Sequence, residues 1–179
     1  RSSGKFLLAT DERGGGVSPP GASCTSGVDN AVGNGGVHAF RASALDTDGP
    51  STAEAAWQAY ARTTDGKKAI YRATPRTGAE ASVCTAHVFQ QIPGQNRIFM
   101  GWYSQGTQVV DYVERSDGTF EFREAGWFIP EKSNTWTSAV FKTAANPDGT
   151  FTYWGAASNF GTRNAVDVYR VTLPAPAAE

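Results

Sequence analysis

Two carboxylates could act together if a hairpin brings them face to face. Asp111 and Glu124 flank an Asp-Gly turn at Asp117-Gly118. If that turn holds two residues, counting outward sets Asp111 opposite Glu124, at the end of the more apolar face of the hairpin. Like charges so close raise the pKa of one carboxyl group, as in the acid and base of glycoside hydrolysis. This register predicts a polar site with Asp111 and Glu124 as candidate catalytic residues. The alternative is a wet rim, or neutralisation by an arginine such as Arg115.

Aromatic side chains are the second chemical resource. They crowd the second half of the chain, and strand alternation sends neighbours such as Trp127 and Phe128 to opposite faces. Some large rings must then lie outside a single core, unless both faces of a sandwich are packed. Exposed rings beside amides suit sugar binding, because a sugar stacks on the ring while the amides bond its hydroxyls. The candidate ligand-binding residues are Trp102, Tyr112, Trp127, Trp136, Trp154, Gln105 and Asn159.

One short segment has the residues of a nucleophile. Residues 102–106 read Trp-Tyr-Ser-Gln-Gly, between an apolar run at 98–101 and Val-Val-Asp at 109–111. This segment resembles the nucleophile elbow of cutinases and related α/β-hydrolase esterases, which read Gly-Tyr-Ser-Gln-Gly. The resemblance is confined to this segment, and it implies that Ser104 is the nucleophile of a serine esterase.

The chain departs from the elbow pattern at three points. Trp102 stands where the elbow needs a small residue, and the family supplies its histidine after the serine. Here both histidines, His38 and His87, precede Ser104. A helix should follow the serine, but residues 107–114 alternate as a strand does. These departures favour a hairpin turn over a catalytic elbow.

We expect neither a metal nor a cofactor. Neither histidine has partners at metal-ligand spacing. The segment Asp46-Thr47-Asp48-Gly49 is reminiscent of a calcium loop, but its glycine comes too early. The triple glycine at residues 14–16 lacks the ending of a phosphate-binding loop.

Composition limits the classes of partner. The 16 basic and 17 acidic side chains nearly cancel, so there is no basic footprint for nucleic acid. No apolar run approaches the ~20 residues that span a bilayer. Two cysteines in a chain rich in Gly, Ser and Thr indicate an oxidising compartment and a Cys24–Cys84 disulfide, worth about 4 kcal/mol. The alternative is two reduced thiols in a cytosolic protein. Because no signal peptide is visible, a secreted chain that starts at Arg1 would be a trimmed form.

The elements that must position these residues are strands joined by tight turns. Asp-Gly recurs at residues 65–66, 117–118 and 148–149, and Gln105-Gly106 is a fourth candidate turn. The only helical pattern lies between Ser51 and Tyr60, where Ser51 and Glu54 have capping-box spacing. The expected strands are residues 37–44, 57–63, 68–73, 82–90, 97–103, 108–114, 119–128, 135–143, 150–156 and 165–173.

The pattern predicts an all-β fold, an antiparallel meander of about ten strands that closes as a barrel or folds as a sandwich, with at most one short helix. Short links after Arg97 predict that sequence neighbours are sheet neighbours. We expect a Gly/Pro-rich segment (1–36) tethered by Cys24, a single β domain (37–173) and a flexible tail (174–179).

The functional expectation is a secreted, extracellular, non-catalytic recognition protein that binds a carbohydrate or a small amphipathic ligand. Two alternatives stay open. One is a polysaccharide hydrolase or lyase that uses Asp111 and Glu124, with His87 or Tyr112 as further candidates. The other is an extracellular inhibitor or interaction protein.

Overall fold

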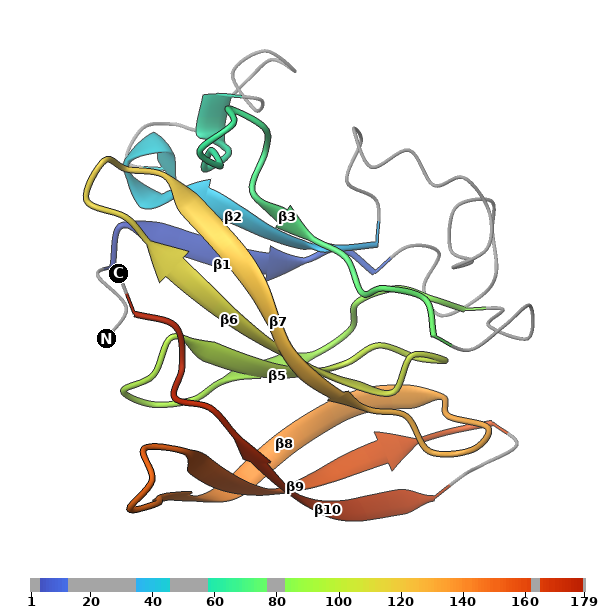
Figure 1. Ribbon diagram of the computed structural model, residues 1–179. Helices are drawn as coiled ribbons and strands as arrows, with labels where there is room; N and C mark the ends of the chain where they lie inside the picture. The colour runs from blue at the N-terminus through green and yellow to red at the C-terminus, as the bar shows by residue number, and fades with distance from the viewer. Residues whose placement is uncertain (1–3, 13–34, 46–57, 77–82, 162–164, 179) are drawn as a thin grey trace.

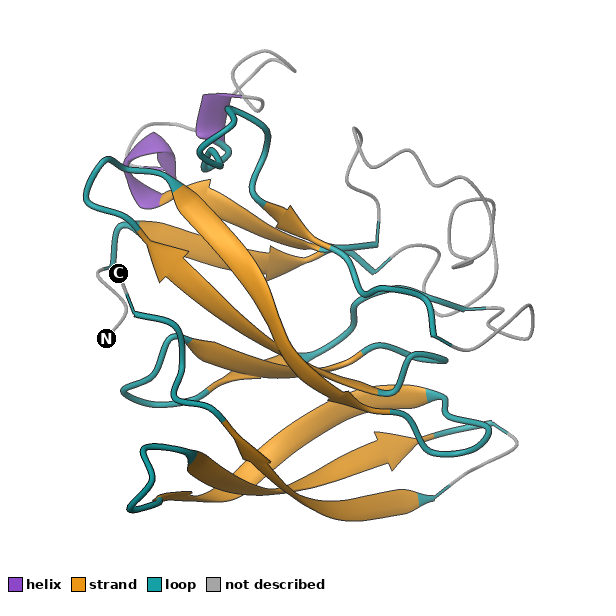
Figure 2. Ribbon diagram, viewed as in Figure 1, coloured by secondary structure: helices purple, strands orange, loops and turns teal. Residues whose placement is uncertain are grey.

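The computed structural model describes residues 4–12, 35–45, 58–76, 83–161 and 165–178. Nearly all regular structure in these ranges is β-strand, which confirms the predicted all-β class (Figure 2). The elements are β1 (Phe6–Thr10), β2 (Val37–Arg41), the 3₁₀ helix η1 (Ala42–Leu45), β3 (Ile70–Tyr71), β4 (Phe89–Gln91), β5 (Arg97–Gly101), β6 (Thr107–Glu114), β7 (Phe120–Phe128), β8 (Thr135–Ala145), β9 (Phe151–Asn159) and β10 (Val166–Leu173).

The described strands form three antiparallel sheets rather than a closed barrel. Their orders are β1-β2-β3, β4-β5-β6-β7 and β10-β9-β8. In Figure 1 the four-stranded sheet lies between the two three-stranded sheets. Of the two predicted closures, the sandwich-like one is therefore correct.

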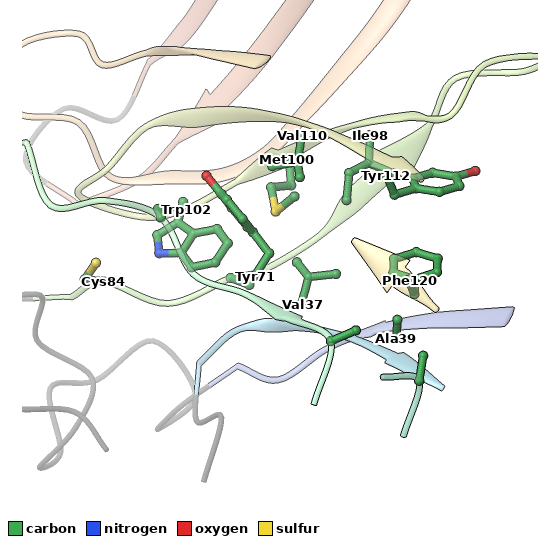
Figure 3. Close-up of a cluster of buried hydrophobic side chains, with 14 residues drawn as sticks. Val37, Ala39, Tyr71, Cys84, Ile98, Met100, Trp102, Val110, Tyr112 and Phe120 are labelled. Carbon is green, nitrogen blue, oxygen red and sulfur yellow. The ribbon is translucent and has the colours of Figure 1, made fainter. Parts of the chain in front are cut away.

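Each face of the four-stranded sheet packs on its own hydrophobic core. One core joins it to the β1–β3 sheet and includes Ile98 and Met100 (Figure 3). The other core joins it to the β8–β10 sheet and includes Phe99 and Tyr153. All five residues of β5 are buried, because alternate side chains enter opposite cores.

The Asp-Gly turns form where the sequence predicts them. Gly66, Gly118 and Gly149 all have φ between 81° and 84°, the left-handed region that glycine adopts without strain. At the β6–β7 turn the N–H of Gly118 donates to the carbonyl of Arg115 at 3.0 Å, and the N–H of Arg115 donates to the carbonyl of Thr119 at 2.9 Å. The loop between the two paired residues therefore has three residues, not two.

That extra residue shifts the register of the hairpin and overturns the predicted carboxylate pair. Asp111 faces Arg123, and it is Val110 that faces Glu124. Paired residues share a face and successive residues alternate, so Asp111 and Glu124 lie on opposite faces of the sheet. The prediction failed because an Asp-Gly sequence suits both two- and three-residue loops.

Several strands differ from their expected positions. β1 lies outside the expected strands, and the described part of the expected strand 57–63, residues 58–63, forms no strand. Tyr60 and Arg62 make isolated bridges, while Gln58 and Ala59 are helical. The helical pattern from Ser51 to Trp57 lies outside the described residues. The short link from β7 leads to β8 in another sheet, so the neighbour rule fails there.

The remaining predictions concern the disulfide, the calcium-like segment, the C-terminal segment and membrane spans. Cys84 is buried, but Cys24 and Asp46–Gly49 lie outside the described residues, so the disulfide stays a prediction. Near the other end, the N–H of Ala177 donates to Oδ2 of Asp111 at 3.1 Å, so the segment after β10 contacts the four-stranded sheet. No described helix is long and apolar enough to cross a bilayer.

Candidate ligand-binding site

An exposed tryptophan on β7 is the centre of the candidate site. Just over half of the Trp127 surface, 53%, is exposed to solvent. The guanidinium carbon of Arg76 lies 3.8 Å from the centre of its ring, a close cation–π contact. The stacked arginine restrains the ring and so provides a fixed aromatic platform.

Arg76 is itself held in place by two further groups. Its guanidinium forms an ion pair with Glu124 on β7, and its backbone N–H donates to Oε1 of Gln105 at 2.8 Å. Tyr71 donates its hydroxyl to the other oxygen of Glu124 at 3.2 Å. Burial, together with the charge of Glu124, raises the pKa of Tyr71, so this phenol stays protonated and remains a donor.

A β-bulge explains how Glu124 and Trp127 come to share a face. They are three positions apart in the chain, which in a regular strand would direct them to opposite faces. Val109 pairs with Gly126 and Val110 with Glu124, so Ala125 is an extra residue in β7. This extra residue offsets the odd spacing. Phe122, Glu124 and Trp127 therefore all lie along the side of β7 that faces β3. The sequence pattern predicts separate roles for Glu124 and Trp127, but no sequence signal marks the bulge that unites them.

Two cavities flank this row of side chains. The larger, the β3–β7 cavity, has a volume of about 910 Å³ and is lined by Thr63, residues 65–72, Glu121 and Phe122. The smaller, of about 270 Å³, lies between β7 and β10. Its lining is mostly apolar and includes Trp127, Phe128 and Leu173, with Thr107 and Arg170 as polar members. Trp127 therefore borders one cavity while its neighbour Tyr71 lines the other.

Three of the predicted ligand-binding residues are wholly buried. Trp102 packs edge-on against Tyr71 in the first core, with ring centres 5.6 Å apart (Figure 3), and Tyr112 stacks on Phe120. Gln105 is completely buried and holds the backbone of Arg76. Gln105 thus holds Arg76, and Trp102 packs on Tyr71, which in turn bonds Glu124.

Trp136 and Asn159 belong to a different part of the molecule. Trp136 is 45% exposed and makes an edge contact with His87, at 4.7 Å between ring centres. Nδ1 of His87 hydrogen-bonds to the carbonyl of Trp136, and its Nε2 lies 3.5 Å from Glu12. Asn159 is buried and accepts a hydrogen bond from Thr135, so it serves the local structure.

The elbow-like segment is a turn. The hydroxyl of Ser104 donates to the backbone carbonyl of Val83, whereas the ring of His87 is engaged by Trp136 and Glu12. The hydroxyl of Tyr103 also donates to Glu12. Burial, and secondly this hydrogen bond, raise the pKa of Tyr103, so its phenol stays protonated and is a poor general base. The described residues therefore show no nucleophile–base pair at Ser104.

The carboxylate of Asp111 forms a buried ion pair with Arg97. Nε and Nη2 of Arg97 bond its two carboxylate oxygens at 2.6 and 2.9 Å, and Nη1 of Arg97 donates to the hydroxyl of Tyr153 at 2.8 Å. Arg97 is 1% exposed. This bidentate geometry satisfies both oxygens of Asp111 within the second core.

Trp154 lies on the outer face of the β8–β10 sheet. It pairs across the sheet with Lys142 on one side and Arg170 on the other, and the ammonium of Lys142 lies 4.5 Å from its ring centre. Nothing in its surroundings links it to Trp127. Among the described residues, no cluster of three metal-ligating side chains occurs.

Comparison with known proteins adds no assignment: no protein-family model, no curated protein and no solved structure matches this chain.

Proposed function

We propose that this protein is an extracellular, non-catalytic recognition protein that binds a carbohydrate across the exposed face of Trp127. The observation that carries the proposal is the fixed platform: a half-exposed indole held by Arg76, which Glu124 and Gln105 hold in turn. A preorganised ring loses little conformational entropy on binding, which favours affinity.

The surroundings of Trp127 match what a sugar ring requires. Its apolar C–H face can stack on the indole, while its hydroxyls can bond the polar groups of Arg76 and Glu124, which are both partly exposed. The β3–β7 cavity and the smaller cavity beside Trp127 offer space for the neighbouring residues of a chain.

The hydrolase alternative loses its geometric basis. It required Asp111 and Glu124 to face one another, but they lie on opposite faces of the sheet, and each is paired with an arginine.

Tryptophan substitution tests the proposal. Oligosaccharides of several linkages are titrated into the wild-type protein and Trp127→Ala, with binding followed by calorimetry and release of reducing ends measured in parallel. We expect at least one sugar to bind without being cleaved. Loss of the platform should weaken its binding about tenfold, the effect of roughly 1.4 kcal/mol.

Trp136→Ala is the matched control, because Trp136 is similarly exposed but lies in the His87 cluster. It should bind like the wild type. Circular dichroism verifies that both variants fold. Unchanged affinity in Trp127→Ala, or failure of every sugar to bind the wild type, would refute the proposal.

A further inference from the structure

The smaller of the two cavities, named the β7–β10 cavity after the strands that border it, opens onto the second hydrophobic core. β7 and β10 are both outer strands of their sheets, so no other described strand closes the space between them (Figure 1). Val109, Phe128 and Leu173 line the cavity and also belong to that core. The cavity is therefore an apolar recess at the edge of the sandwich, and Trp127 is part of its lining.

Gly126 is the residue that keeps this recess open. It pairs with Val109 of β6, so a side chain at this position would share the face of Val109, toward the second core. A Cβ at Gly126 would lie 3.2 Å from Cδ2 of Leu173, which lines the cavity. Any side chain here would therefore occupy space that glycine leaves to a ligand.

Two side-chain hydroxyls line the cavity, and only one of them has a partner. That of Tyr169 hydrogen-bonds to Ser138 at 2.7 Å. Thr107, which is 1% exposed, pairs with Phe128 and so shares its face of the sheet. No described residue hydrogen-bonds to its buried hydroxyl. Because an unpartnered buried hydroxyl costs free energy, a ligand atom that supplies the missing partner binds favourably.

We propose that the β7–β10 cavity binds the acetamido group of an N-acetylated sugar whose ring lies against Trp127. The inference rests on the proposed function and names the class of carbohydrate that it recognises. The methyl of the acetamido group contacts the apolar wall of Val109, Phe128 and Leu173. Its amide hydrogen-bonds to the hydroxyl of Thr107.

Size and polarity together select this substituent. Cavities that enclose a whole small-molecule ligand measure roughly 300–1,000 Å³, so a volume of about 270 Å³ suits a substituent better than a complete oligosaccharide. A sugar hydroxyl would satisfy Thr107 but would bury polar surface against the apolar wall. A plain alkyl group would fill the recess but leave Thr107 without a partner. An acetamido group meets both demands, since its methyl is apolar and its amide both donates and accepts.

Arg170 does not make the cavity a site for an anion, although it is among the lining residues. Its neighbours on β10, Tyr169 and Val171, pack in the second core. Since side chains alternate along a strand, that of Arg170 is directed to the outer face of the β8–β10 sheet, where it pairs with Trp154. A carboxylate in the recess would lose its hydration without a facing cation to replace it.

The edge position of β7 lets one sugar reach both surfaces. Trp127 and Phe128 are neighbours in the strand, so the first faces the β3 side and the second faces the core. No described strand lies beyond β7 in its sheet, and Trp127 contributes to the cavity lining as well as to the platform. A sugar on the indole can therefore extend its substituent around the strand edge into the cavity.

The test compares neutral sugars that differ in the acetamido group. Chitohexaose and cellohexaose have the same linkage, but the first carries an acetamido group on each ring where the second carries a hydroxyl. N-acetylgalactosamine and galactose, each displayed on the same polymer, form a second pair. Calorimetry measures the affinity of the wild-type protein for all four. In at least one pair we expect the N-acetylated member to bind about tenfold more tightly.

Two substitutions assign the preference to the cavity. Thr107→Val keeps the shape of the side chain but removes its hydroxyl, and Gly126→Ala narrows the recess. Each should weaken binding of the preferred N-acetylated sugar about tenfold and leave its hydroxyl counterpart unchanged. Should Gly126→Ala fail to fold, Thr107→Val decides alone. Thr143→Val makes the same change at an exposed position of β8 and should bind like the wild type.

A stability measurement checks the state of Thr107 without any ligand. Because its hydroxyl has no partner in the free protein, Thr107→Val breaks no hydrogen bond. The variant should therefore unfold at the same urea concentration as the wild type or a higher one. A clearly lower midpoint would mean that the hydroxyl is engaged within the protein, which contradicts the proposed site.

The outcomes separate this site from the proposed function. Equal or weaker binding of the N-acetylated member in both pairs, or a preference that neither cavity substitution reduces, overturns the acetamido site. If Trp127→Ala still weakens binding of another sugar, the platform remains. An N-acetyl preference that does not depend on Trp127 overturns the platform instead.

Discussion

At the scale of single residues, the chemical environment assigns different tasks to side chains of the same type. Asp111 and Glu124 both pair with arginine, but the Arg97–Asp111 pair is buried between two sheets and the Arg76–Glu124 pair borders solvent. Removal of one partner from a buried pair strongly destabilises the folded protein, since the other charge is left without compensation. A partly exposed pair can exchange partners with a ligand at lower cost.

Asp111→Asn should therefore reduce stability rather than sugar binding. Neutralising the carboxylate leaves the guanidinium of Arg97 buried and unpaired, which should lower the free energy of unfolding by about 3 to 5 kcal/mol. Urea denaturation measures the change. Glu121→Gln, which breaks pairs at the surface, serves as the comparison and should lose much less. An Asp111→Asn protein of wild-type stability that no longer binds sugar would reverse our assignment.

The sequence identified site residues by type but could not group them. Trp127, Glu124 and Gln105 meet around Arg76, a residue that carried no signal because a single arginine between Thr-Pro and Thr-Gly fits no motif. The contact between Arg76 and β7 joins segments about 50 residues apart, and single-sequence periodicity reports only local geometry. Trp102 was selected for its ring, yet its burial depends on a sheet whose partner could not be foreseen.

At the scale of elements, tight turns were predictable and strand register was not. An Asp-Gly pair specifies where the chain reverses, because glycine accepts a positive φ. It does not fix how many residues the loop contains, and a one-residue error exchanges the two faces of a strand. The bulge at Ala125 then exchanges them again within β7. β1 was missed because its partner lies beyond residues 13–34, so no hairpin signal marked it.

Two glycines should respond differently to alanine. A Cβ at Gly118 would meet no atom within 4 Å, so only the strain of φ 82° opposes the change, about 1 to 2 kcal/mol. A Cβ at Gly101 would lie 2.2 Å from the carbonyl oxygen of Trp136, where β8 crosses the end of β5. Because that obstacle is backbone, we expect Gly101→Ala to lose about 3 kcal/mol or more. Urea denaturation of the two variants gives the comparison, and equal losses would contradict the close approach of β5 and β8.

At the scale of the whole molecule, the sequence indicates strands that are buried on both faces, but it does not indicate where one sheet ends and the next begins. Continuous apolar runs such as residues 98–100 are typical of strands buried on both faces, and β5 has that position. Period-two patterning cannot show where one sheet ends and the next begins, so the separation of β7 from β8 needed long-range packing to be known. The two cores that result bury much of the aromatic content of the chain.

This packing should make the protein sensitive to strong base. Burial raises the pKa of each of its six tyrosines above the ordinary value of 10.0, to about 12 for Tyr169. Since the unfolded chain releases these protons first, their contribution to stability is complete below pH 10 and is lost as the pH rises through about 12.

Absorbance of tyrosinate follows this titration directly. At pH 11 the folded protein should contain clearly less tyrosinate than the same protein unfolded in urea, and unfolding in base should release the remainder together. Identical titration curves for folded and unfolded protein would show that the phenols are not buried.

The bulge in β7 has a consequence beyond the site that it aligns. β7 is the outer strand of its sheet, and outer strands with unpaired backbone groups can add a strand from another molecule and so nucleate fibrils. At Ala125 the strand bends and twists in its middle, which interrupts the straight edge that such stacking requires. The irregularity that unites Glu124 with Trp127 thereby also guards the molecule against polymerisation.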